Sequence, residues 1–303
     1  MTIPMKLPPV VVSRTDRIGD LILSLPVLHY LRKAGFSHIS LHVSPYCRAI
    51  AEWAQFNGLV DYIWVSGEAP PPMIKKAAVL ALVYARLAVK ELKATQPTFI
   101  LGPRTKLPAL WSFHLSVAQH RSRVEKSEMR YNIDLAKAFC SALHCEAPAF
   151  EGLPALKLPS QWSSPRISPD CVLVVSNRGS AANWPIEKYI QMGLELRSQG
   201  KSVDFLVSGE DEAKRLAALK KAGVESQGCG VVTSFSDLRE LIVYLACAQH
   251  VISSSTGPLH LAHAAGVAVT GIYPTKKVQS FERWRPDGYW HSKPVHLIEI
   301  GTS

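Results

Sequence analysis

The amino-acid sequence predicts an α/β fold made of two Rossmann-like units, each a doubly wound parallel sheet. Short apolar runs alternate with longer amphipathic segments along most of the 303 residues, the pattern of strands alternating with helices. The alternation stops near the middle of the chain, where five prolines stand close together, at 148, 154, 159, 165 and 169. Because proline breaks helices and central strands, this stretch reads as a linker. The length also suits two domains of roughly 150 residues.

In the first half, apolar runs predict strands at 10–12, 39–43, 62–65 and 98–101. Helical spacing predicts helices at about 20–33, 48–56, 73–94 and 132–143. The most apolar stretch runs from Ala77 to Val89, which is shorter than the ~18 residues of a membrane span. We expect a buried helix there, with a helix at a membrane interface as the alternative because lysines flank both ends.

In the second half, we expect strands at 172–176, 203–207, 231–232, 251–252 and 267–272, and helices at 186–198, 210–222, 236–248 and 258–265. The predicted organisation is therefore a first domain at 1–150, a linker at 151–170 and a second domain at 171–303. Open parallel sheets bind ligands at the carboxyl ends of their strands. Two such sheets predict a cleft between two strand-end faces.

Composition indicates a soluble globular protein, with 47% hydrophobic and 19% charged residues. The N-terminus lacks the apolar core of a signal peptide, so we expect a cytoplasmic protein. The six cysteines form no Cys-x-x-Cys pair. That spacing argues against zinc sites and a disulfide framework, and we interpret the cysteines as reduced thiols.

Positive charge is concentrated in the first half of the chain. Residues 1–150 hold 18 Lys and Arg against 10 Asp and Glu, whereas residues 151–303 hold 16 against 14. This asymmetry indicates an anionic partner for the first half. The basic residues are dispersed and no nucleic-acid motif is present, so we expect no nucleic-acid partner. An anionic lipid or a phosphorylated glycan fits the charge equally well.

The most informative segment lies between Val251 and Val267, where a strand, a small-residue turn and a helix follow one another. Ser255 or Thr256 can cap the helix, and Gly257 allows a ligand close to the backbone. Such a helix start offers N–H groups and a positive dipole end to an anion such as a diphosphate. His260 lies about one turn into the helix, within reach of the same ligand. An ordinary capped helix is the alternative interpretation.

A second motif follows the first predicted strand. Gly19 suits a tight turn between strand and helix, and Asp20 stands in the first helical turn. An aspartate there can cap a backbone N–H and complement the helix dipole. Its functional interpretation is a general base that takes a proton from a sugar hydroxyl.

The two motifs together resemble glycosyltransferase family 9, the bacterial heptosyltransferases of lipopolysaccharide core assembly. The N-terminal match is Gly19-Asp20 with Leu25-Pro26, and the C-terminal match is Ser254 to Ala262 followed by Gly266-Val267 and Gly271 to Thr275. Trp184-Pro185 and Ser208-Gly209-Glu210 fall at further landmarks of the family. The resemblance implies a GT-B architecture and an inverting transfer that needs no metal and no cofactor. It also implies an ADP-heptose donor on the second domain and an anionic lipid-linked acceptor on the first, of the lipid A-Kdo type.

The resemblance and the local chemistry give a set of candidate residues. Asp20 is the expected catalytic base. The expected donor-binding residues are Asn177, Arg178, Gly209, Glu210, Ser255, Thr256, Gly257 and His260, and the expected acceptor-binding residues are Gly19, Arg104, Lys106, Arg121 and Arg123. We expect a monomer that makes peripheral contact with the cytoplasmic face of the inner membrane.

Three departures from the family pattern bear on the donor. Ser255 stands where the family usually has an aspartate, and Ala182 where it has a lysine or arginine. Only 28 residues follow Thr275, and the family's returning C-terminal helix is not evident. The departures leave alternatives open: a different nucleotide sugar, the same donor with Arg178 supplying the missing cation, or a non-catalytic protein that binds a glycan or nucleotide.

Overall fold

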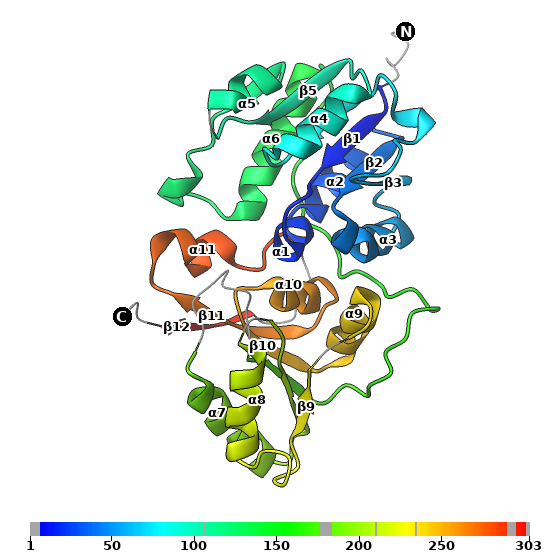
Figure 1. Ribbon diagram of the computed structural model, residues 1–303. Helices are drawn as coiled ribbons and strands as arrows, with labels where there is room; N and C mark the ends of the chain where they lie inside the picture. The colour runs from blue at the N-terminus through cyan, green and yellow to red at the C-terminus, as the bar shows by residue number, and fades with distance from the viewer. Residues whose placement is uncertain are drawn as a thin grey trace. The chain divides into compact units, whose positions relative to one another are not determined.

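The computed structural model describes residues 7–105, 107–175, 184–209, 211–233, 235–289 and 295–300. The chain forms two compact units, Met1–Pro154 and Ala155–Ser303 (Figure 1). Within the described residues, each unit contains one parallel sheet of six strands. The prediction of two doubly wound α/β units is confirmed.

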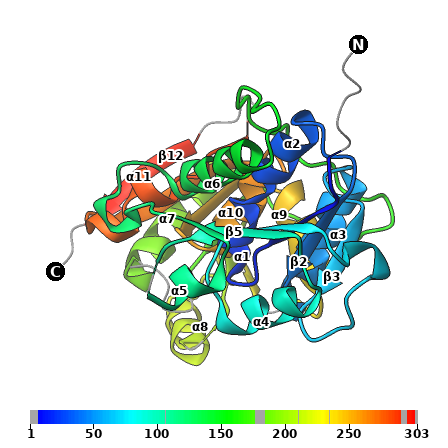
Figure 2. The same ribbon diagram turned by 90° about the horizontal axis from the view of Figure 1, so that it is seen from above.

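The first unit alternates strands and helices from its start. Its strands are β1 (Val10–Ser13), β2 (Ile39–Val43), β3 (Tyr62–Val65), β4 (Ala78–Ala81), β5 (Phe99–Pro103) and β6 (Leu115–Val117). Its α-helices are α1 (Ile18–Ile22), α2 (Leu25–Lys33), α3 (Arg48–Phe56), α4 (Arg86–Ala94), α5 (Leu107–Ser112) and α6 (Glu128–Ala142), and short 3-10 turns lie at Pro45–Cys47, Pro72–Ile74 and Arg121–Arg123. Seen from above, α2 and α6 cover one face of this sheet, and α4 and α5 cover the other (Figure 2).

The strand order in the first unit is β3-β2-β1-β4-β5-β6. The chain moves outward from β1 in one direction and then, beginning at β4, in the other. β1 pairs in parallel with both neighbours, so that Ser13 lies opposite His42 on β2 and Ala81 on β4. This reversal point is where a doubly wound sheet opens a crevice at its carboxyl edge.

The helix predicted at 73–94 is wrong. Residues Ala78–Ala81 form β4, and the helix α4 begins only at Arg86. β4 is a central strand between β1 and β5, with helices over both faces of the sheet, and its residues are fully buried. A strand buried on both faces reads as a continuous apolar run, which periodicity does not separate from a buried helix. The alternative of an interfacial helix over this run is wrong for the same reason.

The helix predicted at 20–33 is two helices, α1 and α2, which separate at Leu23 and Ser24. Pro26 lies in the first turn of α2, and proline has no N–H to continue the hydrogen bonding of α1. Gly19 lies inside α1 and is not one of the glycines with positive φ. The expectation that Gly19 forms a tight turn is therefore wrong. α1 begins at Ile18, one residue before Gly19.

The second unit repeats the plan of the first. Its strands are β7 (Cys171–Val174), β8 (Val203–Leu206), β9 (Gly230–Val232), β10 (His250–Ser254), β11 (Ala268–Pro274) and β12 (Val295–Ile300). Its helices are α7 (Ile186–Ser198), α8 (Glu212–Lys221), α9 (Leu238–Cys247), α10 (Gly257–Ala264) and α11 (Phe281–Trp284), with a 3-10 turn at Lys277–Gln279. The order β12-β11-β10-β7-β8-β9 reverses between β7 and β10.

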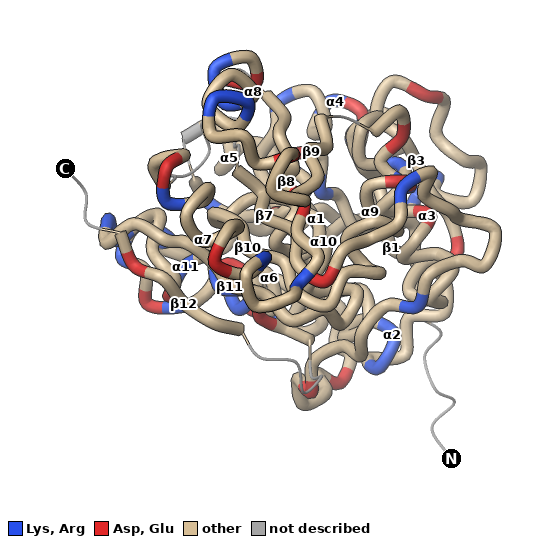
Figure 3. Tube along the Cα trace, turned by 90° about the horizontal axis from the view of Figure 1, so that it is seen from below, with Lys and Arg blue, Asp and Glu red and all other residues tan. Residues whose placement is uncertain are grey.

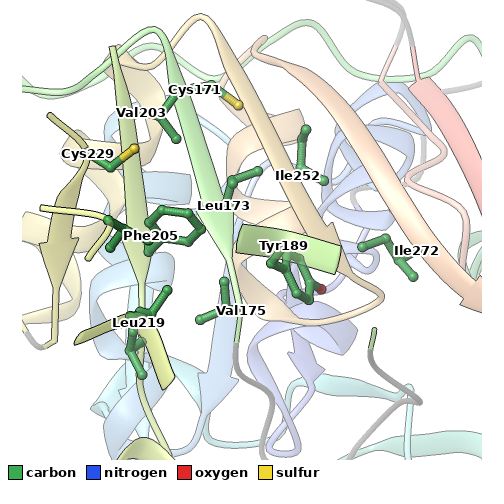
Figure 4. Close-up of a cluster of buried hydrophobic side chains, with 12 residues drawn as sticks. Cys171, Leu173, Val175, Tyr189, Val203, Phe205, Leu219, Cys229, Ile252 and Ile272 are labelled. Carbon is green, nitrogen blue, oxygen red and sulfur yellow. The ribbon is translucent and has the colours of Figure 1, made fainter. Parts of the chain in front are cut away.

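The core of the second unit forms between β7, β8 and α7. Leu173, Phe205 and Tyr189 lie together with exposed fractions of 0% (Figure 4). Gly193 on α7 lies directly against the ring of Phe205, where a Cβ would come within 2.4 Å of Cζ. The helix therefore packs at a distance that only glycine allows. The sequence did not predict the edge strands β6 and β12 or the helices α5 and α11. β6, with three residues, and α11, with four, are too brief to show a period.

Candidate active site

Arg14 is the centre of the polar cluster at the carboxyl edge of the first sheet. It follows β1 directly, and its side chain is 1% exposed. Its Nε donates to Asp16 Oδ1 at 2.6 Å and its Nη2 to Asp20 Oδ1 at 2.6 Å. Its Nη1 donates to the carbonyl oxygen of Leu82, which follows β4, at 3.3 Å. The guanidinium thus lies across the point where the strand order reverses.

The same guanidinium also reaches α6. Arg14 Nη2 lies 3.4 Å from Glu128 Oε1, and Nη1 donates to Asn132 Oδ1 at 3.3 Å. Ser127 caps α6 by accepting a hydrogen bond from Arg130 N. This cap fixes the start of the helix, so Glu128 and Asn132, four residues apart, are presented on one side of it.

Asp20 has a perturbed carboxyl group. Its pKa is raised from 3.8 to about 6, chiefly by burial; the negative charges of Asp16 and Glu128 contribute to this rise, and Arg14 opposes it. The Asp20 side chain keeps 15% of its surface exposed. It is therefore a partly accessible carboxylate whose pKa lies near neutrality, which is the range in which a general base is most effective.

Arg121 belongs to the same cluster. It is in ion-pair contact with Glu128, donates to Gln119 Oε1 at 2.8 Å, and its Nη2 lies 3.3 Å from Asn132 Oδ1. Its side chain is 17% exposed. Arg121 is thus held beside Glu128, a carboxylate that is 1% exposed and needs positive charge next to it, and its contact with the acceptor stays a prediction.

Among the other expected acceptor residues, Gly19 directly precedes Asp20 in α1. Arg104 follows β5 at the carboxyl edge and is exposed, and Arg123 is 65% exposed with Glu125 Oε1 at 3.9 Å. Lys106 lies outside the described residues. Lys, Arg, Asp and Glu are distributed over both units (Figure 3). Several basic side chains are paired locally, such as Lys126 with Asp134 at 2.6 Å.

The second unit contributes the predicted helix start. Thr256 is the N-cap residue of α10, and Gly257 and Pro258 open the helix. Thr256 Oγ1 donates to the carbonyl oxygen of Ser254 at 3.3 Å and lies 3.1 Å from Ser253 Oγ, so the threonine side chain bonds back to β10 rather than capping α10. The expectation of a side-chain cap by Thr256 is wrong. The first backbone N–H groups of a helix have no partners within the helix, an arrangement that often binds anions.

His260 lies in the first turns of α10 and is 2% exposed. Burial lowers its pKa to about 4, so the imidazole is neutral at physiological pH. Its Nδ1 and the Oγ of Ser254 are buried atoms without a hydrogen-bond partner in the part of the chain that the structure describes. Buried polar atoms are nearly always paired, so these two are candidate contacts for a bound group.

The remaining donor candidates follow β7 and β8. Gly209 comes three residues after the end of β8 with φ of 95°, a left-handed conformation that glycine adopts readily. Its carbonyl oxygen accepts from Glu212 N at the start of α8. Asn177, Arg178 and Glu210 lie outside the described residues, as does Ala182. Ser255 is half-buried between β10 and α10. Burial raises the pKa of the Tyr273 hydroxyl, and a hydrogen bond with Ser255 opposes this rise.

Sequence reasoning missed Arg14, Glu128 and Asn132. Arg14 stands six residues before Asp20, and an arginine directly after the buried strand β1 was a usable signal. Glu128 is an acidic residue within a basic stretch, but its link to Arg14 spans 114 residues of sequence and only the fold reveals it.

Two kinds of feature are absent from the described ranges. No three His, Cys, Asp or Glu side chains come together there as metal ligands. None of the helices there has both the length and the apolar composition needed to cross a bilayer. All six cysteines carry free thiols.

Two doubly wound units, each with polar groups at the strand order reversal, are the GT-B architecture of glycosyltransferases. The comparisons with known proteins agree. The family model described as glycosyltransferase family 9 (heptosyltransferase) matches residues 119–290, more than half of the chain. The chain belongs to this family and is a glycosyltransferase. The matched span includes Glu128 and the α10 motif, whereas Asp20 precedes it.

Similar proteins are related at low sequence identity. A Haemophilus influenzae protein named "Putative glycosyltransferase" is 24% identical over 91% of this chain and 85% of its own length. The crystal structure of a family 9 glycosyl transferase from Veillonella parvula matches with a TM-score of 0.75 and 16% identity, over 98% of this chain and 87% of that one. E. coli heptosyltransferase WaaC with ADP matches with a TM-score of 0.69 and 15% identity, over 96% and 93%. These structures share the fold of this chain.

Proposed function

We propose that the protein is an inverting, metal-independent heptosyltransferase that moves heptose from ADP-heptose to the lipopolysaccharide inner core, on an acceptor of the lipid A-Kdo type. Asp20 deprotonates the acceptor hydroxyl, and that oxygen attacks the anomeric carbon of the donor from the side opposite the departing diphosphate. The C–O bond to the diphosphate breaks, ADP leaves with the electron pair, and the anomeric configuration inverts.

The observation that carries this proposal is the environment of Asp20. Its carboxylate has a pKa of about 6, keeps 15% exposure, and is fixed by a 2.6 Å bond from Arg14. The bond uses Oδ1 and thereby holds the side chain in one orientation. A carboxylate that is ionised at pH 7 and still basic enough to accept a proton is suited to this step.

The donor diphosphate would bind at the start of α10. The N–H groups after Thr256 and the helix dipole stabilise the charge that develops on the leaving group. Neutral His260 and Ser254 are available for hydrogen bonds to the donor. WaaC has been solved with ADP and with an ADP-heptose analogue, which supports an adenine nucleotide here. Because Ser255 replaces the usual aspartate, a different nucleotide sugar is the second candidate; with ADP-heptose as the donor, Arg178 is the expected replacement for the cation missing at Ala182.

The acceptor would be anionic and presented at the cytoplasmic face of the inner membrane to a monomeric enzyme. The net charge of residues 1–150, with 18 basic and 10 acidic side chains, supports an acceptor with several negative charges. Arg104 and Arg123 are the exposed basic side chains proposed to contact it.

The direct test is sugar transfer by Asp20→Asn, measured as ADP release in EDTA beside wild type. Loss of a general base lowers the rate by roughly 10²- to 10⁴-fold. Asp134→Asn is the matched control, because Asp134 is 35% exposed on α6 and pairs with Lys126. Near-equal rates for Asp20→Asn and wild type would remove Asp20 from the base role.

Calorimetry with ADP-, UDP- and GDP-sugars identifies the nucleotide, and binding of every donor without turnover would contradict the proposed transfer.

A further inference from the structure

An exposed apolar surface lies on α4 and α5 of the first unit, on the face of the sheet away from α2 and α6 (Figure 2). Trp111 is 86% exposed and Leu87 is 64% exposed, and Leu110 and Leu115 are each 40% exposed. We call these four residues, together with Arg86, Lys90 and Lys93, the α4–α5 surface. Large apolar side chains grouped with polar ones on an open surface usually mark a site of interaction.

The two helices meet at Trp111. Lys93 Nζ of α4 donates to the carbonyl oxygen of Trp111 at 3.4 Å. A hollow of about 290 Å³ opens between the helices and the start of β5, lined by Lys93, Pro97, Ile100, Trp111, Ser112, Phe113 and His114. His114 Nδ1 accepts from Ile100 N at 2.8 Å, so its Nε2 carries the proton of the neutral ring. The hollow therefore has an aromatic wall and N–H donors at its rim.

The charge of this surface is positive. α4 carries three basic residues, Arg86, Lys90 and Lys93, and one acidic residue, Glu91. Glu91 accepts hydrogen bonds from Ser66 Oγ and Gly67 N at 2.7 Å each, and its Oε2 lies 3.2 Å from His42 Nε2. Its charge is thus directed toward β2 and β3. Lys90 and Lys93 remain exposed on α4, one turn apart.

We propose that the α4–α5 surface binds an anionic lipid bilayer. Trp111 and Leu110 enter the interface between headgroups and acyl chains, where tryptophan is preferred, and Lys90 and Lys93 contact headgroup phosphates. Both the apolar side chains and the lysines are needed. A few apolar side chains alone give only weak, reversible membrane binding, and electrostatic attraction adds to it. This inference deepens the proposed function by assigning the membrane contact to a surface of this chain.

The test measures co-sedimentation of the full chain with vesicles, without acceptor or donor. We expect binding to vesicles of phosphatidylcholine mixed with phosphatidylglycerol, little binding to phosphatidylcholine alone, and weaker binding at high salt. Trp111→Ser should lower the partition coefficient roughly tenfold, the lower end for burial of a large apolar side chain. Lys90→Gln and Lys93→Gln should each lower it about fivefold. All three side chains are exposed, so the variants should unfold at the wild-type temperature.

Matched controls come from the second unit. Ile167→Ser removes a side chain that is 95% exposed, and the pair Lys220→Gln and Lys221→Gln removes two charges from the last turn of α8. These variants should bind vesicles as wild type does. The proposal is overturned if Trp111→Ser and the α4 variants bind like wild type, or if the controls lose as much binding. It is also overturned if wild type ignores anionic lipid and instead self-associates through Trp111 in sedimentation.

The outcome is separable from that of the proposed function. Asp20→Asn should retain full vesicle binding, because Asp20 is not part of the α4–α5 surface. A protein that binds vesicles but transfers no sugar would refute the function and support the membrane surface. A protein that transfers sugar to a water-soluble acceptor fragment but binds no vesicles would do the opposite.

Discussion

Replacement of Arg14 by methionine tests whether this buried cation sets the basicity of Asp20. Arg14 donates to Asp20 at 2.6 Å, and its charge is the principal influence that lowers the pKa of Asp20 against burial and the neighbouring carboxylates. Methionine has a similar length and no charge. Without the guanidinium, the carboxyl group keeps its burial and the repulsion from Asp16 and Glu128, so its pKa should rise.

The size of the shift follows from the contact. An arginine in direct contact lowers a carboxyl pKa by about 1 to 3 units, so the pKa of Asp20 should move from about 6 to roughly 7–9. At pH 7 the ionised fraction would then fall from about 90% to between about 50% and 1%, which lowers activity roughly 2- to 90-fold. The lost activity should return as the pH is raised. Removing one partner of a buried pair also costs about 3–5 kcal/mol of stability, so Arg14→Lys serves as the milder variant.

Two measurements follow the carboxyl group. The pH profile of kcat/KM should show its acid limb displaced upward in Arg14→Met and less so in Arg14→Lys. Carboxyl ¹³C chemical shifts, with Asp20→Asn to identify the resonance, should report the same displacement without substrate. Lys126→Gln, which breaks a surface pair with Asp134, should leave both unchanged. If folded Arg14 variants show the wild-type acid limb in kcat/KM and the wild-type titration of the Asp20 carboxyl resonance, Arg14 does not set the pKa of Asp20.

Two further predictions concern the second unit and the acceptor. The pKa of His260 is about 4 in the folded protein and ordinarily 6.5. As the pH falls, the imidazole is therefore protonated in the unfolded chain before it is protonated in the folded one. Its contribution to stability is present above pH 6.5 and declines toward pH 4, by about 2 kcal/mol between pH 7 and 5. Urea unfolding of His260→Gln should lose that much less stability over this interval, and equal losses would contradict it. Arg104→Glu with Arg123→Glu should raise the acceptor KM several-fold at low salt, with the donor KM nearly unchanged. If both constants move, or neither moves, these arginines do not recognise the acceptor.

Much of the architecture could be predicted because it depends on local pattern. The helix predicted at 186–198 is α7, Ile186–Ser198, since its apolar spacing and the preceding proline are both local signals. The turn before Gly257 likewise requires small residues and a proline, so the start of α10 was predicted to within one residue. Two parallel sheets follow from the alternation of such segments.

The error at Ala77–Val89 shows the limit of local pattern. Buried helices and central strands are both apolar throughout, and only the pairing of β4 with β1 and β5 decides between them. The break between α1 and α2 was predictable from Pro26, but the broad apolar face of the segment favoured one continuous helix.

The sequence by itself determined the two-unit α/β plan, the family motifs and the position of Asp20, because each depends on residues that are neighbours in the chain. Only the tertiary structure decided the environment of Asp20 and the ion pair of Arg121. Arg14 meets Glu128 and Asn132 across 114 and 118 residues, and Arg121 is held at a buried carboxylate. A pKa and an ion pair depend on distances and burial, which the folded chain sets and the order of residues alone does not contain.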